Sequence, residues 1–149
     1  MEPQAGGTRP SSMVEFIRGM EPPPVARLVG IELVSVEPGA AVFELAADER
    51  HANPMGTLHG GILCDLADAA MGVAFVSLIE VGETYTTLEL KINFLKPIWK
   101  ARLRASGRVI RKGKSVGLVA CEVTDEEGAL VAYATSTCMV LAGEQAKGR

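Results

Sequence analysis

The sequence lacks a strong excess of charge of either sign. Its formal net charge is −3 over 149 residues, whereas general nucleic-acid binders usually present a strongly basic surface. Hydrophobic residues make up 48% of the chain and charged residues 22%, which is the balance of a globular protein and not of a disordered one. The composition therefore predicts a folded protein with no nucleic-acid partner.

Cysteines are few, and none form a Cys-x-x-Cys pair. The three cysteines, Cys64, Cys121 and Cys138, lie far apart in apolar segments. An odd number of cysteines without a secretory signal is typical of a reducing compartment, where a buried thiol behaves as a small hydrophobic side chain. We therefore expect a cytoplasmic protein whose thiols belong to the core. A reactive thiol is the alternative.

No segment has the full pattern of a signal peptide or of a membrane span. Residues 1–12 contain Pro, Gly, Thr and Ser but no apolar run, which predicts a disordered tail. Residues 61–79 could be mistaken for a membrane span, but they contain Asp65 and Asp68. Each of these would cost about 2.5–3.5 kcal/mol at a bilayer centre. The segment therefore predicts a buried helix, and we expect no membrane contact.

The length favours a single domain, which we place at residues 13–142, with a tail at 143–149. Apolar residues at helical spacing predict a helix at 13–20, which the following three prolines end. A second short helix is expected at 24–28 with Pro at its first turn. Two strand-like runs around a Glu-Pro-Gly turn then predict a hairpin, at residues 31–36 and 41–45.

The second half of the domain begins with a long helix and continues with strands. After a polar loop at 48–58, apolar residues keep a helical period to about residue 79. That helix is apolar on most sides, as a helix surrounded by other structure should be. The period then changes to two, with strand-like runs at 87–94, 101–109, 115–124 and 129–141. Three long strands in succession, joined by short turns, are expected to form an antiparallel meander.

Together these elements predict an α+β fold in which an antiparallel sheet curls around one long central helix. Only a central helix needs to be apolar on nearly all sides. The edge strands of such a sheet are prone to pair with other chains. Pairing them across a dimer would remove the exposed edges, so we expect dimerisation by sheet extension.

The loop that enters the long helix carries the chemical motif. It reads NPMGTLHGG from Asn53 to Gly61, and Asp68 follows nine residues after His59. With a Leu-x-Asp-x-Ala run around Asp68 and the order of elements, the chain closely resembles the hotdog-fold thioesterases of the phenylacetyl-CoA thioesterase (PaaI-like) group over residues 25–141. The resemblance implies hydrolysis of acyl-CoA thioesters without a cofactor, since coenzyme A is part of the substrate.

The two glycines of the motif lie where the loop enters the helix. Their N–H groups are among the first four, which have no partner inside a helix. A helix N-terminus favours an oxygen that gains negative charge, and glycine lets a substrate approach the backbone closely. The resemblance implies that the Gly60 N–H polarises the thioester carbonyl and that Gly61 contacts the substrate. The alternative is a glycine-rich helix start that serves packing alone.

Asp68 is the candidate nucleophile or general base. A carboxylate on a helix that otherwise belongs to the core is costly, so it needs a partner or a function. The residues alone do not decide between nucleophile and base. Asp65 is the rival candidate, but only Asp68 occupies the position that the family motif implies.

Three further polar residues are implied by the same resemblance. Asn53 would orient water or the acyl carbonyl, and its alternative is a turn residue before proline. For His59 we expect helix capping or substrate positioning. Thr87 matches the family's hydroxyl residue after the helix, although the alternation places it on the polar face of its strand, and Thr86 is a possible substitute. Since His51 and His59 have no carboxylate or thiol at ligand spacing, we expect no metal site.

A basic turn is the candidate site for the phosphates of coenzyme A. Arg111, Lys112 and Lys114 cluster there with Arg108, at a place where family members contact the nucleotide. The alternative is a turn that is charged only because it faces solvent. The motif leaves the choice between an aromatic and a straight-chain acyl group open.

Two competing functions remain at this stage. One is a non-catalytic hotdog module that binds acyl-CoA, and Asp68 argues against it. The other is a hotdog dehydratase, whose local motif the HGG sequence does not resemble.

Along one helix Gly60 and Asp68 are separated by roughly 12 Å. We therefore expect a homodimer that sets two helices antiparallel and shares its active sites, and the family resemblance adds a homotetramer.

Overall fold

The computed structural model describes residues 12–148, which form a sheet of six antiparallel strands in the order β1-β2-β4-β5-β6-β3. The helical elements are α1 (Met13–Arg18), α2 (Pro24–Val29), η1 (Glu49–His51), α3 (Gly60–Val76) and η2 (Gly143–Ala146). The strands are β1 (Ile31–Glu37), β2 (Ala40–Ala47), β3 (Thr84–Phe94), β4 (Ala101–Lys112), β5 (Val116–Thr124) and β6 (Leu130–Leu141).

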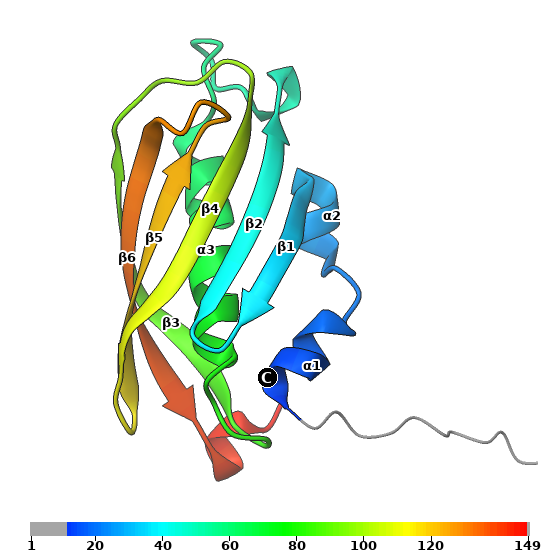
Figure 1. The fold of residues 1–149 in the computed structure, drawn as a ribbon, viewed down its shortest axis with the longest axis vertical. Helices are drawn as coiled ribbons and strands as arrows, with labels where there is room; N and C mark the ends of the chain where they lie inside the picture. The colour runs from blue at the N-terminus through cyan, green and yellow to red at the C-terminus, as the bar shows by residue number, and fades with distance from the viewer. Residues whose placement is uncertain (1–11, 149) are drawn as a thin grey trace, which may run out of the picture.

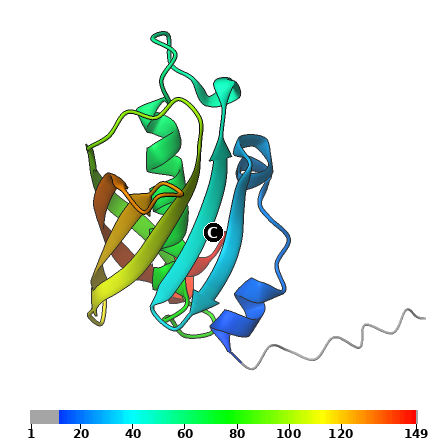
Figure 2. The same ribbon diagram turned by 45° about the horizontal axis from the view of Figure 1, so that its top comes forward.

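The sheet curls around α3, as the sequence predicts, and α1 and α2 lie beside β1 away from the central helix (Figures 1 and 2). The predicted N-terminal tail falls on residues 1–11, outside the described part of the chain, apart from Ser12. The hydroxyl of Ser12 accepts a hydrogen bond from the Glu15 N–H and caps α1. The segment predicted as a C-terminal tail contains the short 3-10 helix η2.

The four strand-like runs predicted after the long helix all form strands, but the first of them lies apart from the meander. Four strands follow α3, and only β4, β5 and β6 form the expected meander. β3 pairs with β6, so it lies at the edge of the sheet opposite β1. A tight hairpin between β3 and β4 is prevented because residues 95–100 form a crossing segment that contains Pro97, which cannot donate to a strand ladder.

The core lies between α3 and the concave face of the sheet. On α3, Leu66, Ala70, Met71 and Phe75 are fully buried. The helix packs directly on β4, where a Cβ added to Gly107 would lie 2.4 Å from the Ala70 carbonyl oxygen. Glycine at this position therefore lets the backbones of helix and strand meet, which fixes the depth of α3 in the sheet.

The loop before α3 is tied to two neighbouring segments. The Leu58 N–H donates to the Ile98 carbonyl oxygen at 2.6 Å, and the His59 N–H donates to that of His51 at 2.9 Å. His51 is buried and binds the Val29 carbonyl through Nε2 at 2.8 Å. These bonds hold Leu58 and His59, the two residues before the helix, in a defined place, which a site at the helix N-terminus requires.

Candidate active site

Asp68 lies on the side of α3 that faces β3. The hydroxyl of Thr87 donates a hydrogen bond to Asp68 Oδ1 at 3.3 Å. Burial raises the pKa of Asp68 above its ordinary value of 3.8, and the Thr87 hydrogen bond opposes that rise. The carboxyl is half-buried and still reachable from solvent. It is therefore a half-buried carboxylate whose basicity burial raises.

A β-bulge in β3 turns Thr87 toward the inner face of the sheet, contrary to the prediction. The pairing between β3 and β6 shifts between Thr87 and Glu89, and the bulge places Leu88 on the outer face, where it is 54% exposed. Thr87 consequently shares the inner face with Leu90, although strict alternation would put the two on opposite faces. The prediction that Thr87 lies on the polar face was wrong, because a single bulge inverts the alternation on one side of it.

Asp65 has a less defined environment. Burial, and then the charge of Asp68, raise the pKa of Asp65. Within residues 12–148 its carboxyl has no hydrogen-bond partner, whereas Asp68 has Thr87. The structure thus gives an orienting partner to Asp68 and none to its rival.

The start of α3 leaves one donor open. His59 is the N-cap, and its Nδ1 accepts a hydrogen bond from the Gly61 N–H at 2.8 Å, while the Ile62 N–H donates to the His59 carbonyl at 3.0 Å. The Gly60 N–H has no hydrogen-bond partner among the described residues. His59 therefore caps the helix as expected, and of the two glycines only Gly60 retains a free donor.

Asn53 organises the loop with its side chain. Its Oδ1 accepts from the N–H groups of Met55 and Thr57 at 2.9 and 3.2 Å, and its Nδ2 donates to Thr57 Oγ1 at 2.8 Å. These contacts are those of a turn-forming asparagine. They favour the structural alternative for Asn53, since its amide oxygen is already occupied.

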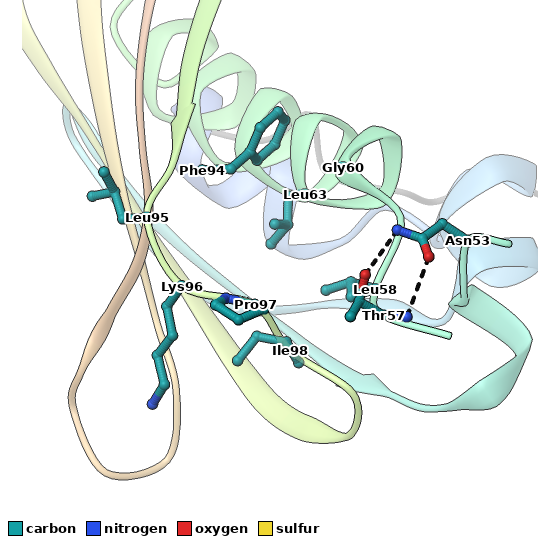
Figure 3. Close-up of a pocket in the computed structure, with 10 residues that line it drawn as sticks. All are labelled: Asn53, Thr57, Leu58, Gly60, Leu63, Phe94, Leu95, Lys96, Pro97 and Ile98. Carbon is teal, nitrogen blue, oxygen red and sulfur yellow. Dashed lines mark hydrogen bonds between the residues drawn. The ribbon is translucent and has the colours of Figure 1, made fainter. Parts of the chain in front are cut away.

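Asn53 and Gly60 nevertheless line one pocket of about 390 Å³. Figure 3 shows the phenyl ring of Phe94 and the side chain of Leu63 beside Gly60 at the helix start. Lys96 extends away from Asn53, and its ammonium binds Asp125 at 2.5 Å. The other lining residues are Thr57, Leu58, Leu95, Pro97 and Ile98. Gly60, whose N–H has no partner among residues 12–148, thus lines a largely apolar pocket.

Phe94 is a pocket residue that sequence reasoning missed. The alternation assigns it to the core, but it is 55% exposed, and a Cβ on Gly60 would lie 2.8 Å from its Cζ. The ring covers the Cα of Gly60 and leaves no room for a side chain there. Only the tertiary placement of the end of β3 over the helix start reveals this contact.

The basic turn between β4 and β5 lies at the opposite end of the molecule from the start of α3, where Gly60 lies (Figure 1). Arg111 and Lys114 are exposed, and Arg111 borders a hollow of about 330 Å³ with Val116, Leu118 and Thr137. The described residues contain no ion pair between an acid and Arg111, Lys112 or Lys114. No acidic side chain among the described residues neutralises these cations. Within one chain, however, they lie far from the start of α3.

The histidines, cysteines and acids of the described residues do not form a metal centre. Residues 12–148 contain no cluster of three or more His, Cys, Asp or Glu that could hold a metal ion. Burial raises the pKa of the Cys121 thiol to about 12 and also raises those of Cys64 and Cys138. Cys121 and Cys138 are buried in the core as expected, and Cys64 is partly buried. No helix in this part of the chain combines the length and apolarity that crossing a membrane requires.

Comparison with known proteins identifies the family. The family model of the Thioesterase superfamily matches residues 55–132, which include the HGG motif, Asp68 and Thr87. The chain belongs to the thioesterase superfamily. This result confirms the predicted resemblance and the prediction of a thioesterase enzyme.

Relatives in sequence and structure agree with this assignment. The 1,4-dihydroxy-2-naphthoyl-CoA hydrolase of Listeria monocytogenes is 35% identical over 112 residues, which are 75% of this chain and 91% of the relative. Human acyl-coenzyme A thioesterase 13 is 29% identical over 114 residues, covering 74% and 81% of the two chains.

Solved structures confirm the hotdog fold. The PaaI protein from the phenylacetic acid degradation operon of E. coli superimposes with a TM-score of 0.75 at 28% identity, covering 80% of this chain and 85% of that one. A conserved protein of Pseudomonas aeruginosa superimposes with a TM-score of 0.76 at 32% identity and covers 80% and 94%.

Proposed function

We propose that this thioesterase hydrolyses acyl-CoA thioesters to a free acid and coenzyme A. The observation that carries the proposal is Asp68, a half-buried carboxylate oriented by Thr87 on a helix whose first N–H, that of Gly60, is open. Acyl-CoA hydrolysis is the activity named for relatives that cover most of this chain. Two groups that thioester hydrolysis requires, a base or nucleophile and an oxyanion donor, thus lie on one helix.

The chemistry follows one of two routes from the same residues. As a general base, Asp68 takes a proton from water, whose oxygen attacks the carbonyl carbon; the C–S bond then breaks, and the thiolate leaves and takes up a proton. As a nucleophile, Asp68 attacks the carbonyl, releases the thiolate, and leaves an acyl anhydride that water hydrolyses. The oxyanion of either route would accept from the Gly60 N–H, a contact that can contribute about 3 kcal/mol.

One chain cannot bring Gly60 and Asp68 to the same carbonyl. They are eight positions apart on α3, which separates them by about 12 Å along the axis. We therefore propose a two-fold dimer with antiparallel helices, in which Gly60 of one chain meets Asp68 of the other. The edge strand β3, which pairs only with β6 among the described strands, is available to extend the sheet. Two such dimers would form the proposed homotetramer.

The other candidate residues take supporting roles in this proposal. His59 holds the first turn of α3, and Asn53 shapes the loop around the Gly60 donor. Glycine at position 61 leaves room for the capping imidazole of His59, because a Cβ there would lie 2.9 Å from His59 Nδ1. The exposed Arg111 and Lys114, with the half-buried Lys112, would bind the phosphates of coenzyme A. The reaction as proposed uses water, protein side chains and the Gly60 N–H, and it needs no cofactor. The cytoplasmic location of the protein remains a prediction from its free thiols.

Release of free thiol from a panel of aromatic and straight-chain acyl-CoA esters tests this function. The wild-type protein should release thiol from at least one member of the panel, and the Asp68→Ala protein should not. A folded wild-type protein that binds acyl-CoA but releases no thiol from any ester would replace the enzyme with a non-catalytic binding module.

A further inference from the structure

Tyr85 lies next to the Asp68 site, and neither route of the proposed reaction uses its hydroxyl. Tyr85 precedes Thr87 by two positions on β3, so both side chains point to the inner face of the strand. A Cβ added to Gly72 would lie 2.1 Å from Tyr85 Oη. The phenol ring packs edge-on against Phe75, with ring centroids 5.8 Å apart. The hydroxyl therefore occupies the space that a side chain at position 72 would fill.

This contact is one helical turn away from the contact of Thr87 with Asp68. Gly72 follows Asp68 by four positions on α3, so the two lie on the same face, about 6 Å apart along the axis. β3 therefore approaches this face at two successive places, with Thr87 on Asp68 and Tyr85 on Gly72. Because position 72 has no side chain, the phenol lies directly against the helix on the Asp68 face.

The Tyr85 hydroxyl is an open donor. Within residues 12–148 the hydroxyl has no hydrogen-bond partner. Since the same residues contain no fully buried side-chain N or O atom without a partner, the hydroxyl must keep some surface exposed to water. Burial, and then the charge of Asp68, raise the pKa of Tyr85 to about 12. The phenol keeps its proton at neutral pH and can therefore donate a hydrogen bond to a carboxylate or to a water bound to it.

We infer that Tyr85 is a water-positioning residue, whose hydroxyl donates a hydrogen bond to the attacking water beside Asp68. The inference rests on the proposed function, and it holds for both routes because each consumes a water at this place. Gly72 makes the arrangement possible, since any side chain there would displace the phenol. The Thr87 hydroxyl orients the carboxylate, and the Tyr85 hydroxyl orients the water.

The Tyr85→Phe variant tests the inference, because it keeps the ring and removes only the donor. We expect kcat for hydrolysis to fall about tenfold with KM nearly unchanged, the effect of losing one hydrogen bond to a reacting group. Hydroxylamine can replace water as the attacking group, and it does not depend on a bound water. With hydroxylamine present, the ratio of acyl hydroxamate to free acid should therefore rise about tenfold in the variant. A purely structural role would lower both products together.

Two further variants complete the experiment. Tyr133→Phe removes the hydroxyl of the other tyrosine, which lies opposite Asn93 between the buried residues Ala132 and Ala134, and it should leave rate and product ratio unchanged. Gly72→Ala should displace the phenol and raise the product ratio as Tyr85→Phe does. An active wild-type protein with an unchanged product ratio in Tyr85→Phe and Gly72→Ala would overturn the inference alone. A wild-type protein that releases no thiol would overturn the proposed function as well.

Discussion

The helix α3 has two unlike sides. Toward β4 and β5 it is dry and closely packed: added Cβ atoms at Gly107 and Gly117 would lie 2.4 Å from the Ala70 carbonyl oxygen and 2.4 Å from the Phe75 ring, respectively. Toward the edge strand β3 it carries the carboxylate of Asp68, which faces Thr87. The first side holds the helix in the sheet. The second keeps polar groups at a border where another chain or a substrate can reach them.

The two sides of α3 thus serve different purposes: one stabilises the fold, and the other carries the candidate catalytic carboxylate. A core face tolerates little change, because close packing leaves no space for new atoms. The β3 side holds a carboxylate whose pKa burial raises, so its charged form is less stable in the folded protein than in water. Changes on the dry side should therefore cost stability, and changes on the polar side should cost activity.

The largest expected effect is on the polar side, at Asp68. Asp68→Asn should lower kcat by about two to four powers of ten, as expected for the loss of a positioned acid–base group, while binding of an unreactive acyl-CoA analogue persists. Thiol release and equilibrium binding measure the two effects. Asp65→Asn is the matched control and should keep most of the activity. If Asp65→Asn were the dead variant, the wrong carboxylate would have been chosen.

The same variant should not lose stability. Since the pKa of Asp68 is raised on folding, the folded state binds more protons than the unfolded state between the ordinary value of 3.8 and the raised one. The contribution of Asp68 to stability therefore falls as pH rises through that window. Asp68→Asn removes this unfavourable contribution of the buried charge. The free energy of unfolding of the variant at pH 7 should therefore equal or exceed that of the wild type. A markedly destabilised Asp68→Asn protein would break the division between the two sides.

The next effect is on the dry side, at Gly107. Gly107→Ala places a methyl group against the backbone of α3 and should lower the free energy of unfolding by about 1–3 kcal/mol, the usual cost of overpacking. Ser106→Ala on the exposed face of the same strand is the control and should change stability little. Chemical denaturation of both variants gives the comparison. Equal stabilities would show that the helix has room to move away from the sheet.

A smaller effect is expected at the basic turn, which belongs to neither side of α3. Reversing the charge of Lys112 and Lys114 should raise KM for acyl-CoA about tenfold and leave kcat largely intact, because phosphate contacts far from the reaction contribute uniform binding. An acyl-pantetheine substrate, which lacks the nucleotide, should be insensitive to the change. Equal effects on both substrates would show that the turn is structural or that the nucleotide lies elsewhere.

The smallest effect is expected at Thr87. Thr87→Val removes the donor that favours the ionised form of Asp68, so the pKa of Asp68 should rise further. The base must be ionised to act, and the acid limb of the kcat/KM profile should therefore move to higher pH, with a loss of severalfold at neutral pH. Thr86→Val on the outer face of β3 is the control. An unshifted limb in Thr87→Val would remove Thr87 from the site.

The sequence predicts most of this arrangement because its signals are local. The helical period, the turn signals and the loop motif identify α3, the hairpin and Asp68 from neighbouring residues alone. The place of β3 beside β6 and the bulge at Thr87 depend on pairing between distant strands, which alternation within one strand does not encode. Two further contacts also join segments that are distant in the sequence. The Phe94 ring packs on Gly60, and the Tyr85 phenol packs on Gly72.

The central claim is that one active site is built from Gly60 of one chain and Asp68 of another, and mixed dimers test it most directly. Gly60→Pro deletes the proposed donor at the first helical position, where proline is tolerated. The ψ of His59, 132°, already suits a residue before proline. Gly60→Ala adds a Cβ but keeps the N–H, so it separates loss of the donor from crowding of Phe94.

Asp68→Ala and Gly60→Pro proteins should each be inactive as pure preparations, and Gly60→Ala should retain more activity than Gly60→Pro. A heterodimer of the two inactive chains contains one site with both Gly60 and Asp68 intact, so thiol release should recover to about half of the wild-type value per dimer. Verified heterodimers without recovery, or a stable monomer with full activity, would contradict the shared site.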